Sequence, residues 1–416
     1  MLKGALAGAG LIGCCTALAR IANLAEAPRA FLLLFTLAFI CYAAGVWLLA
    51  EARGGRAIVL ILVVAGAARL VLLPAPPTLS TDAYRYVWDA RVAAAGISPY
   101  AHAPDAPELH RLKDQTIYPR LNHLGWRTIY PPAAQVFFQG VYAVRPDSVL
   151  AMKIALGSAD LLGIGLLFGL LGACGVPAAR AVIYAWNPLV LTEIWGSAHL
   201  DALVIPAVVG AVWAALANRH ALSGALLGVG AAIKLYPAAL LPVLLWGPGL
   251  LPGAAAFAAV LLAGYAPSMA LGLQALGSLP RYMAEEYFNP GLLRALVNIP
   301  VLTVAAALCW IVWVATRREM PLAERAVLLI GGLVLLSPNI FPWYALWLLP
   351  VLAAAPSWPW IAFTGTVAWA YAFFLHEPWA VPWWARAVEL APLAAGALWW
   401  WTLGGRGVMA WRERSP

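Results

Sequence analysis

Three charged side chains, Asp82, Arg85 and Asp89, stand at the spacing of one helical face in a chain that otherwise carries few charges. Asp, Glu, Lys and Arg make up only 11% of the 416 residues, yet a large share of them falls within the stretch 79–132. If residues 81–95 form a helix, positions i, i+3 and i+7 share one side of it. Carboxylates can exchange protons and an arginine can hold an anion. We therefore expect the polar chemistry of this chain to take place in that stretch.

Polar side chains also interrupt three later apolar regions. His199 and Asp201 follow one apolar run, whereas Lys234 and Tyr236 stand in the middle of another, and Tyr344 opens a third. The order of the apolar runs places these residues on the same side of a membrane as the first stretch. Four separate segments are therefore expected to meet at one membrane face.

Each candidate also has an interpretation that involves no chemistry. Thr81 and Asp82 could simply cap a helix, and Asp89 could pair with Arg85 or Arg91 on a solvated face. The later candidates have ordinary roles as well. Lys234 could reach from a helix end to the membrane surface, and His199 could be a hydrogen-bonded turn residue. Asp201 could suit the dipole at a helix N-terminus, and Tyr344 could belong to an interfacial aromatic belt.

The elements that must position these residues are helices in a membrane. The composition is 63% hydrophobic, with a mean hydropathy of +0.83, whereas soluble domains are about 45–50% apolar. Uncharged runs long enough to cross a bilayer recur along the chain. We predict an all-α polytopic membrane protein, a single transmembrane domain over residues 1–416 without a soluble domain. The net charge of +8 reflects loop arginines and does not indicate a nucleic-acid partner.

The apolar runs predict about 14 transmembrane helices, with a range of 12 to 14. The long segment 74–147 is the first large outer loop, which is expected to contain juxtamembrane helices, and 273–299 is a second outer loop. The predicted crossings are 5–23, 31–50, 57–73, 148–172, 179–195, 200–217, 221–234, 235–251, 254–272, 300–316, 324–338, 341–356, 358–375 and 387–405.

The distribution of Lys and Arg gives the predicted orientation. With the N-terminus inside, nearly all basic residues of the short loops lie on the inner side, and only Arg29 and Arg386 lie outside. This bias is typical of cytoplasmic loops. We therefore predict cytoplasmic N- and C-termini, with the loop 74–147 outside. The Ala-, Gly- and Arg-rich composition favours a bacterial inner membrane.

Two segments decide this count of crossings. Pro131–Val144 is apolar but has only 14 residues, about 21 Å of helix, which is short for a bilayer core of about 30 Å. It is therefore predicted to be a juxtamembrane helix on the outer surface. The run Ala221–Leu251 must instead cross twice, with its break at Lys234–Pro237 on the outer side.

The order of the motifs resembles a known group of enzymes. The motifs are STDAYRYVWDARVAAAGISPY from Ser80 to Tyr100, Tyr130-Pro131-Pro132, Trp186-Asn187-Pro188, Ser197-Ala198-His199-Leu200-Asp201, Ile233-Lys234-Leu235-Tyr236-Pro237, and Ser337-Pro338 followed by Pro342-Trp343-Tyr344 and Leu349-Pro350. Together they resemble the polytopic GT-C glycosyltransferases that use a polyprenyl-phosphate sugar. Glycosyltransferase family 87 and the polyprenol-phosphate-mannose-dependent mannosyltransferases are the most similar members. The resemblance covers roughly residues 79–350.

This resemblance implies a GT-C-like bundle, a sugar–phosphate–polyprenol donor, and a glycan or glycolipid acceptor at the outer membrane surface. By matched position, Asp82 is the candidate general base and Lys234 the candidate contact of the donor phosphate. Arg85 is added as a second phosphate contact from its place on the helix. Asp89, Tyr100, Tyr130, His199, Asp201, Tyr236 and Tyr344 are further candidates. Mannose is favoured as the sugar by the resemblance alone.

No cofactor is expected, and a divalent metal is not favoured. Metal-dependent members of the class pair acids of the first loop with a second acidic motif. Asp201 could supply one ligand, but no closely spaced pair of acids accompanies it, and Mg²⁺ or Mn²⁺ needs several oxygen ligands.

Two other functions remain open at the level of sequence. A transporter or flippase of a lipid-linked sugar typically shows repeated halves and charges near the middle of the membrane, and neither is visible here. In a non-catalytic assembly subunit, Asp82 and Lys234 would have no function.

Overall fold

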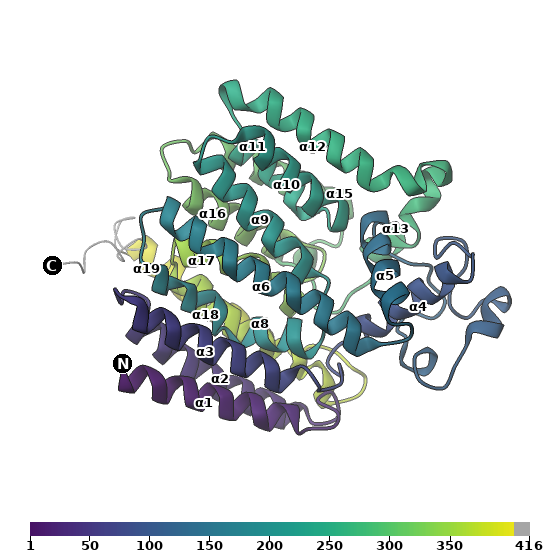
Figure 1. Ribbon diagram of the computed structural model, residues 1–416, viewed down its shortest axis with the longest axis horizontal. Helices are drawn as coiled ribbons and strands as arrows, with labels where there is room; N and C mark the ends of the chain where they lie inside the picture. Colours follow the sequence, from purple (N-terminus) through teal and green to yellow (C-terminus); the bar gives the residue numbers. More distant parts are fainter. Residues whose placement is uncertain (403–416) are drawn as a thin grey trace. The chain divides into compact units, whose positions relative to one another are not determined.

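The computed structural model describes residues 1–402, and within them the chain is built from helices without a strand (Figure 1). The described chain divides into two compact units. One comprises Met1–Ala75, Leu167–Glu193 and residues 288–402, and the other comprises Pro76–Leu166 and Ile194–Tyr287. The predicted single transmembrane domain over 1–416 stays a prediction, because residues 403–416 lie outside the described residues.

The first unit packs its N-terminal helices α1 to α3 together around one tryptophan. Trp186 is fully buried and donates its indole N–H to the carbonyl of Ile61 at 2.9 Å. Gly8 and Gly45 make room for the indole, because a Cβ at Gly45 would lie 2.6 Å from the ring. The helices of this unit are α1 Leu2–Ala19, α2 Pro28–Leu49, α3 Gly55–Leu72, η3 Ala178–Ala181, α7 Val182–Ala185, α8 Pro188–Val190, α14 Leu292–Leu296, α15 Pro300–Thr316, α16 Leu322–Leu336, η8 Pro342–Trp347, α17 Leu349–Ala354, α18 Trp358–Thr366, η9 Val367–Leu375 and α19 Trp383–Thr402.

The second unit holds the predicted outer loop and the helices around the break. Its helices are α4 Asp82–Ala94, η1 Pro107–Leu112, η2 Tyr118–Arg120, α5 Pro132–Val144, α9 Asp201–Leu216, α10 His220–Ile233, η5 Tyr236–Leu240, α11 Leu241–Leu244, η6 Gly247–Gly249, α12 Leu250–Tyr265, η7 Ala266–Leu276 and α13 Leu279–Glu285. Two helices, α6 Val149–Ala173 and the π-helix η4 Leu191–Gly196, belong partly to each unit. The helices predicted over 81–95 and 131–144 are thus present as α4 and α5, and the placement of α5 on the membrane surface stays a prediction.

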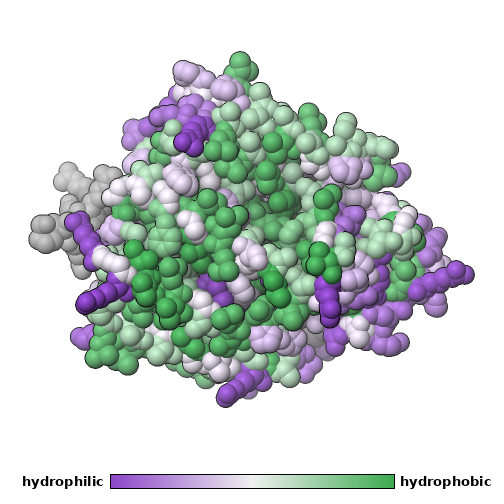
Figure 2. Space-filling model, viewed as in Figure 1, coloured by the Kyte–Doolittle hydropathy of each residue, from purple (hydrophilic) through white to green (hydrophobic). Residues whose placement is uncertain are grey.

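The surface is that of an integral membrane protein. Hydrophobic residues cover much of the face drawn in Figure 2, and many large apolar side chains are exposed. Within residues 1–402, five helical segments are long and apolar enough to cross a membrane, namely Leu2–Ala19, Pro28–Leu49, Gly55–Leu72, Val149–Ala173 and Gly247–Glu285. Three shorter apolar helices, Asp201–Leu216, His220–Ile233 and Pro300–Thr316, accompany them.

Several predicted crossings are not continuous helices, so the expected number of about 14 stays a prediction. The segment 179–195 is divided among η3, α7, α8 and η4, and Asn187-Pro188 marks one of the breaks. The segments 341–356 and 358–375 are each divided between a 3-10 helix and a short α-helix. Sequence hydropathy could not show these breaks, because the residues at a break are buried and apolar just as they are in a continuous helix.

The run 221–251 turns back on itself at the predicted break. Helix α10 ends at Ile233, and Lys234 adopts an extended conformation with φ −153° and ψ 133°. The return limb is irregular, made of η5, α11 and η6, which corrects the expectation of one helix over 235–251. It ends beside the start of α10, because a Cβ at Gly249 would overlap the His220 ring. The two limbs are therefore antiparallel, as two crossings require.

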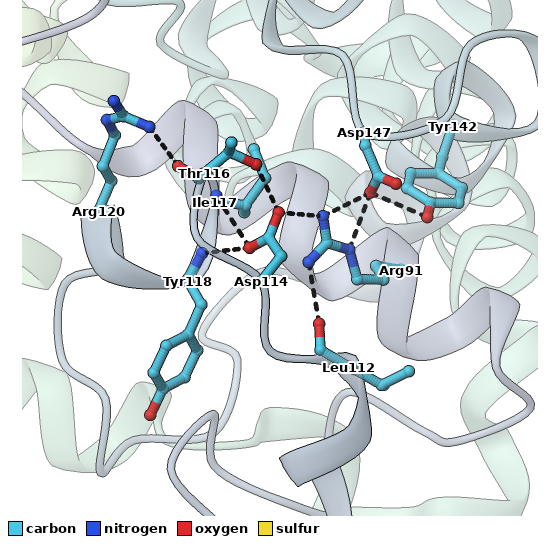
Figure 3. Close-up of polar contacts among 9 residues, drawn as sticks. All are labelled: Arg91, Leu112, Asp114, Thr116, Ile117, Tyr118, Arg120, Tyr142 and Asp147. Carbon is cyan, nitrogen blue, oxygen red and sulfur yellow. Dashed lines mark hydrogen bonds and ion pairs between the residues drawn. The ribbon is translucent and has the colours of Figure 1, made fainter.

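Arg91 of α4 holds part of the loop that follows this helix. Figure 3 shows Arg91 between two carboxylates, donating to Asp147 at 2.8 Å and to Asp114 at 3.0 Å, and a third hydrogen bond goes to the carbonyl of Leu112 at 3.0 Å. The Asp114 carboxylate also accepts the backbone N–H groups of Ile117 and Tyr118 at 3.0 and 2.9 Å. Burial raises the pKa of Asp114, but these hydrogen bonds outweigh it and hold the pKa well below its usual range.

Candidate active site

The carboxylate of Asp82 lies at the first turn of α4 but does not act as its cap. Thr81 occupies the N-cap position without a side-chain hydrogen bond. Asp82 instead accepts a hydrogen bond from the amide of Asn122 at 2.9 Å. Its other oxygen lies 3.7 Å from Nδ1 of His199, and the Asp82 side chain is 20% exposed. The carboxylate is thus held from two sides and still reaches the surface.

The turn 197–201 connects this carboxylate to the predicted lysine. Ala198 has a φ of +61°, which reverses the chain after η4. The turn is fixed to α4 because the backbone N–H of Leu200 donates to the hydroxyl of Tyr86 at 3.2 Å. Beyond the turn, Asp201 begins α9 and is nearly fully buried. His199 therefore lies beside Asp82, two residues from the acid that contacts Lys234.

Lys234 binds Asp201 with its ammonium. The distances from Nζ to the two carboxylate oxygens are 2.8 and 2.9 Å, and the lysine side chain remains 24% exposed. The structure thus places both main sequence candidates, Asp82 and Lys234, in contact with the same five-residue turn. Tyr236, the neighbouring candidate, begins η5 directly after the break and is half-buried.

Arg85 and Asp89 form a buried pair on α4, which corrects the expectation of a solvated face. Nε of Arg85 lies 2.8 Å from Asp89, and the two side chains are 5% and 2% exposed. Asp89 also accepts the amide of Gln135 on α5 at 2.9 Å, and Arg85 donates to the carbonyl of Trp126 at 2.8 Å. The pair therefore joins α4, α5 and the loop. The role of Arg85 as a phosphate contact stays a prediction.

The two candidate tyrosines of the loop, Tyr100 and Tyr130, contact each other. Tyr100 donates its hydroxyl to the carbonyl of Tyr130 at 2.7 Å. The Tyr130 ring packs edge-on against Tyr86, with centroids 5.0 Å apart. Burial, and then the charge of nearby Asp82, raise the pKa of Tyr130 well above its usual value. Tyr130 is therefore neutral and lies near the Asp82 carboxylate, whereas Tyr100 supports the backbone of Tyr130.

Tyr344 lies in η8 of the first unit, in an aromatic cluster. Its ring stacks on Trp347 with centroids 4.5 Å apart and packs edge-on against Phe341 at 5.4 Å. This packing assigns Tyr344 neither to an aromatic belt nor to substrate contact, so its role stays a prediction.

Sequence reasoning missed three residues of the second unit that hold the candidates. Asn122 contacts Asp82, Tyr86 holds the turn, and Gln135 completes the buried pair. The last two could have been found, because Tyr86 follows Asp82 by one helical turn and Gln135 is a polar residue on an apolar helix. No spacing signal marks Asn122. Among the described residues, no group of three or more His, Cys, Asp and Glu side chains is arranged to hold a metal ion.

Comparison with known proteins places the chain in a family. The sequence model described as "alpha-(1->6)-mannopyranosyltransferase, N-terminal domain" matches residues 13–248, which include the carboxylate, the turn and the lysine. The chain belongs to this alpha-(1→6)-mannopyranosyltransferase family. The membership agrees with the resemblance to mannosyltransferases seen in the motifs.

One curated relative and one solved structure can be compared with this chain. A probable alpha-(1→6)-mannopyranosyltransferase from Mycolicibacterium smegmatis is 25% identical over 354 residues, covering 68% of this chain and 63% of the relative. The matched region thus spans less than two thirds of that relative. The crystal structure of ArnT from Cupriavidus metallidurans bound to undecaprenyl phosphate aligns with a TM-score of 0.47 and 17% identity, over 85% of this chain and 73% of ArnT.

Proposed function

We propose that this protein is a membrane glycosyltransferase that moves mannose from a polyprenyl-phosphate donor to a hydroxyl of a glycan or glycolipid acceptor. Family membership supports the sugar and the reaction class. The observation that carries the site is the turn 197–201, in which His199 lies beside a surface carboxylate and Asp201 binds a lysine. A glycosyl transfer from a phosphate donor needs groups of these two types.

Asp82 is the general base in this proposal. A base must lie within reach of the acceptor hydroxyl, and Asp82 combines partial exposure with two neighbours that restrict its rotation. The amide of Asn122 holds one oxygen and His199 lies beside the other. The proton of the acceptor hydroxyl passes to the carboxylate as the acceptor oxygen bonds to the anomeric carbon. The bond from that carbon to the phosphate oxygen breaks, and polyprenyl phosphate leaves.

Lys234 stabilises the phosphate that leaves. Negative charge grows on the phosphate as its bond to the sugar breaks, and a positioned cation lowers the energy of that state. The ammonium is partly exposed, and Asp201 fixes its position. Polyprenyl tails are apolar, so the exposed apolar side chains of the second unit suit the lipid.

The reaction is proposed to occur at the outer face of a bacterial inner membrane, with both termini in the cytoplasm. The support is the bias of basic residues toward the predicted inner loops. No cofactor or metal is assigned to the reaction. A nucleic acid is not among the proposed partners.

Transfer by purified protein tests the proposal. Reconstituted protein is incubated with a panel of labelled polyprenyl-phosphate sugars and an acceptor, and the labelled product is identified. Asp82→Asn should lower turnover by about 10²–10⁴-fold, because an amide cannot accept the proton. The matched control is Asp105→Asn, an exposed acid of the same loop, which should leave turnover unchanged.

Two outcomes would count against this function. Turnover of Asp82→Asn within about threefold of wild type would remove Asp82 as the base, since loss of a general base costs far more. Movement of labelled lipid across vesicles without any glycosylated product would favour a transporter or flippase instead.

A further inference from the structure

A second polar surface lies next to Asp82, where the first outer loop meets α13. The backbone N–H of Ser278 donates to the carbonyl of Thr128 at 3.1 Å. Gly277 allows this approach, because its φ is +54° and a Cβ there would overlap the Thr128 carbonyl. The two segments are thus joined through their backbones, and their side chains form one continuous surface.

Charged and aromatic side chains alternate across this junction. His123 stacks on Trp126 with centroids 4.5 Å apart, and the guanidinium of Arg281 lies 4.9 Å from the Trp126 ring. His123 also lies 3.4 Å from Glu286, and Arg281 binds Glu285 at 2.8 Å. We call the set His123, Trp126, Arg281, Tyr282, Glu285 and Glu286 the α13 surface.

Much of the α13 surface is open to solvent, although the Glu286 side chain is only 17% exposed. The side chains of His123, Arg281 and Glu285 are 39%, 51% and 52% exposed. Trp126 and Tyr282 are half-buried, with their rings edge-on at 6.4 Å. Exposed ion pairs contribute little stability, about 0–1 kcal/mol each. The exposed charged groups of this surface therefore add little to the stability of α13.

The charges of the α13 surface indicate which ligand it fits. Two carboxylates, Glu285 and Glu286, accompany the cations, so a polyanion such as a phosphate-rich chain would be repelled as much as attracted. A neutral polyol fits better, because each hydroxyl both donates and accepts hydrogen bonds. Planar guanidinium and carboxylate groups can bind neighbouring hydroxyls, and aromatic rings pack against the apolar faces of sugars.

The position of the α13 surface beside Asp82 indicates its function. Asn122, whose amide binds Asp82, directly precedes His123 in the chain. One edge of the α13 surface therefore begins at the carboxylate that we assign as the base. Building on the proposed transferase function, we propose that the α13 surface binds the sugar units of the acceptor glycan behind the hydroxyl that reacts.

Direct binding tests this assignment without requiring turnover. Purified full-length protein is titrated with soluble α-1,6-linked mannotriose and followed by saturation-transfer NMR. Wild-type protein should bind saturably, and Arg281→Gln and Glu286→Gln should weaken binding by about tenfold or more, the loss expected for a hydrogen bond to a charged group. Lys113→Gln is the matched control, because Lys113 packs on Tyr118 at 4.7 Å in the same loop but outside this surface.

Kinetics separate this site from the rest of the reaction. The same two variants should raise the acceptor KM by a similar factor while leaving the donor KM and the release of sugar to water unchanged. Unchanged melting temperatures would show that α13 has kept its place. Saturable mannotriose binding that neither variant weakens would overturn the assignment, and so would the absence of binding by wild type.

The two proposals fail in different ways. If wild type binds mannotriose through the α13 surface but transfers no sugar, the surface stands and the transferase function falls. If transfer proceeds with an unchanged acceptor KM in both variants, the function stands and the surface is rejected.

Discussion

The ammonium of Lys234 lies 2.8 and 2.9 Å from the two carboxylate oxygens of Asp201. Lys234 has apolar neighbours on both sides in the chain, Ile233 and Leu235, and a lysine in such surroundings is costly in lipid unless it is paired with an anion. The anion present is a protein carboxylate from the head of α9. A donor phosphate would therefore share the ammonium with Asp201, or take its place, so the two residues should act as one unit.

A double-mutant cycle should show this coupling. We expect Lys234→Met to lower kcat/KM for the donor strongly, because it removes the cation. Asp201→Asn should lower the same quantity, because it removes the carboxylate that holds the Lys234 ammonium in place. The double variant should be no worse than Lys234→Met, since residues in one ion pair have non-additive effects. The measurement is kcat/KM for the donor. Losses that simply add would show that Asp201 does not act through Lys234.

Lys234 should also face the outer compartment. The run 221–251 turns back at this residue, and if Arg219 and Arg317 both lie on the cytoplasmic side, as the charge bias predicts, the turning point lies outside. A cysteine at position 234, in a variant from which the five native cysteines are removed, should react with a membrane-impermeant thiol reagent added outside. Labelling from the cytoplasmic side alone would reverse the topology. A cysteine at position 219 is the control, and it should react only with reagent added from the cytoplasmic side.

The elements around the site could largely be predicted from the sequence, and their contacts could not. The helical spacing from Asp82 to Asp89 predicts α4, and two prolines predict the start of α5. The break after Ile233 follows from the charge and proline there. These are local signals, in which a short stretch of residues determines its own conformation.

The burial of α4 was the main error in that prediction. A helix with Arg85, Asp89 and Arg91 is typical of a solvated face, yet all three are buried. Each finds partners far along the chain, such as Asp114 and Asp147 for Arg91. Burial of a charge depends on partners brought by folding, and hydropathy does not report them. Asn122 was missed for the same reason, because its contact with Asp82 spans 40 residues.

Transfer activity should survive EDTA. The motivation is that the Asp201 carboxylate already binds an ammonium with both oxygens, which leaves that acid poorly suited to a divalent metal that needs several oxygen ligands. Initial rates are compared before and after chelation and dialysis. Loss of activity that Mg²⁺ or Mn²⁺ restores would contradict this expectation and would make Asp201 a candidate ligand.

Asp89→Asn should destabilise the protein far more than Glu285→Gln. Both acids pair with an arginine four residues away, but the Arg85–Asp89 pair is buried and the Arg281–Glu285 pair is about half exposed. Removing one partner of a buried pair costs about 3–5 kcal/mol, whereas an exposed i,i+4 pair contributes about 0.3–0.5 kcal/mol. Thermal unfolding in detergent checks the difference. Equal melting temperatures for the two variants would contradict the burial of α4.

The Arg91–Asp114 contact should make the outer loop sensitive to strong acid. Hydrogen bonds from Arg91, Thr116 and two backbone amides lower the pKa of Asp114 in the folded state, despite its burial. A carboxyl with a lowered folded pKa stabilises the protein fully above its unfolded value, about 3.9. This contribution is lost as the pH falls below that value toward the folded pKa. Neutral pH therefore retains the whole effect.

Comparison of wild type with Asp114→Asn measures this contribution. At pH 7 the variant should melt at a lower temperature, because Arg91 has lost a charged partner while Asp147 remains. The gap in melting temperature should narrow as the pH is lowered from about 4 toward 2, because Asp114 takes up a proton in the unfolded chain over this range while the folded state still holds it ionised. Limited proteolysis of the loop 97–131 should follow the same trend. A gap that stays constant over this range would show that the Asp114 charge does not anchor the loop.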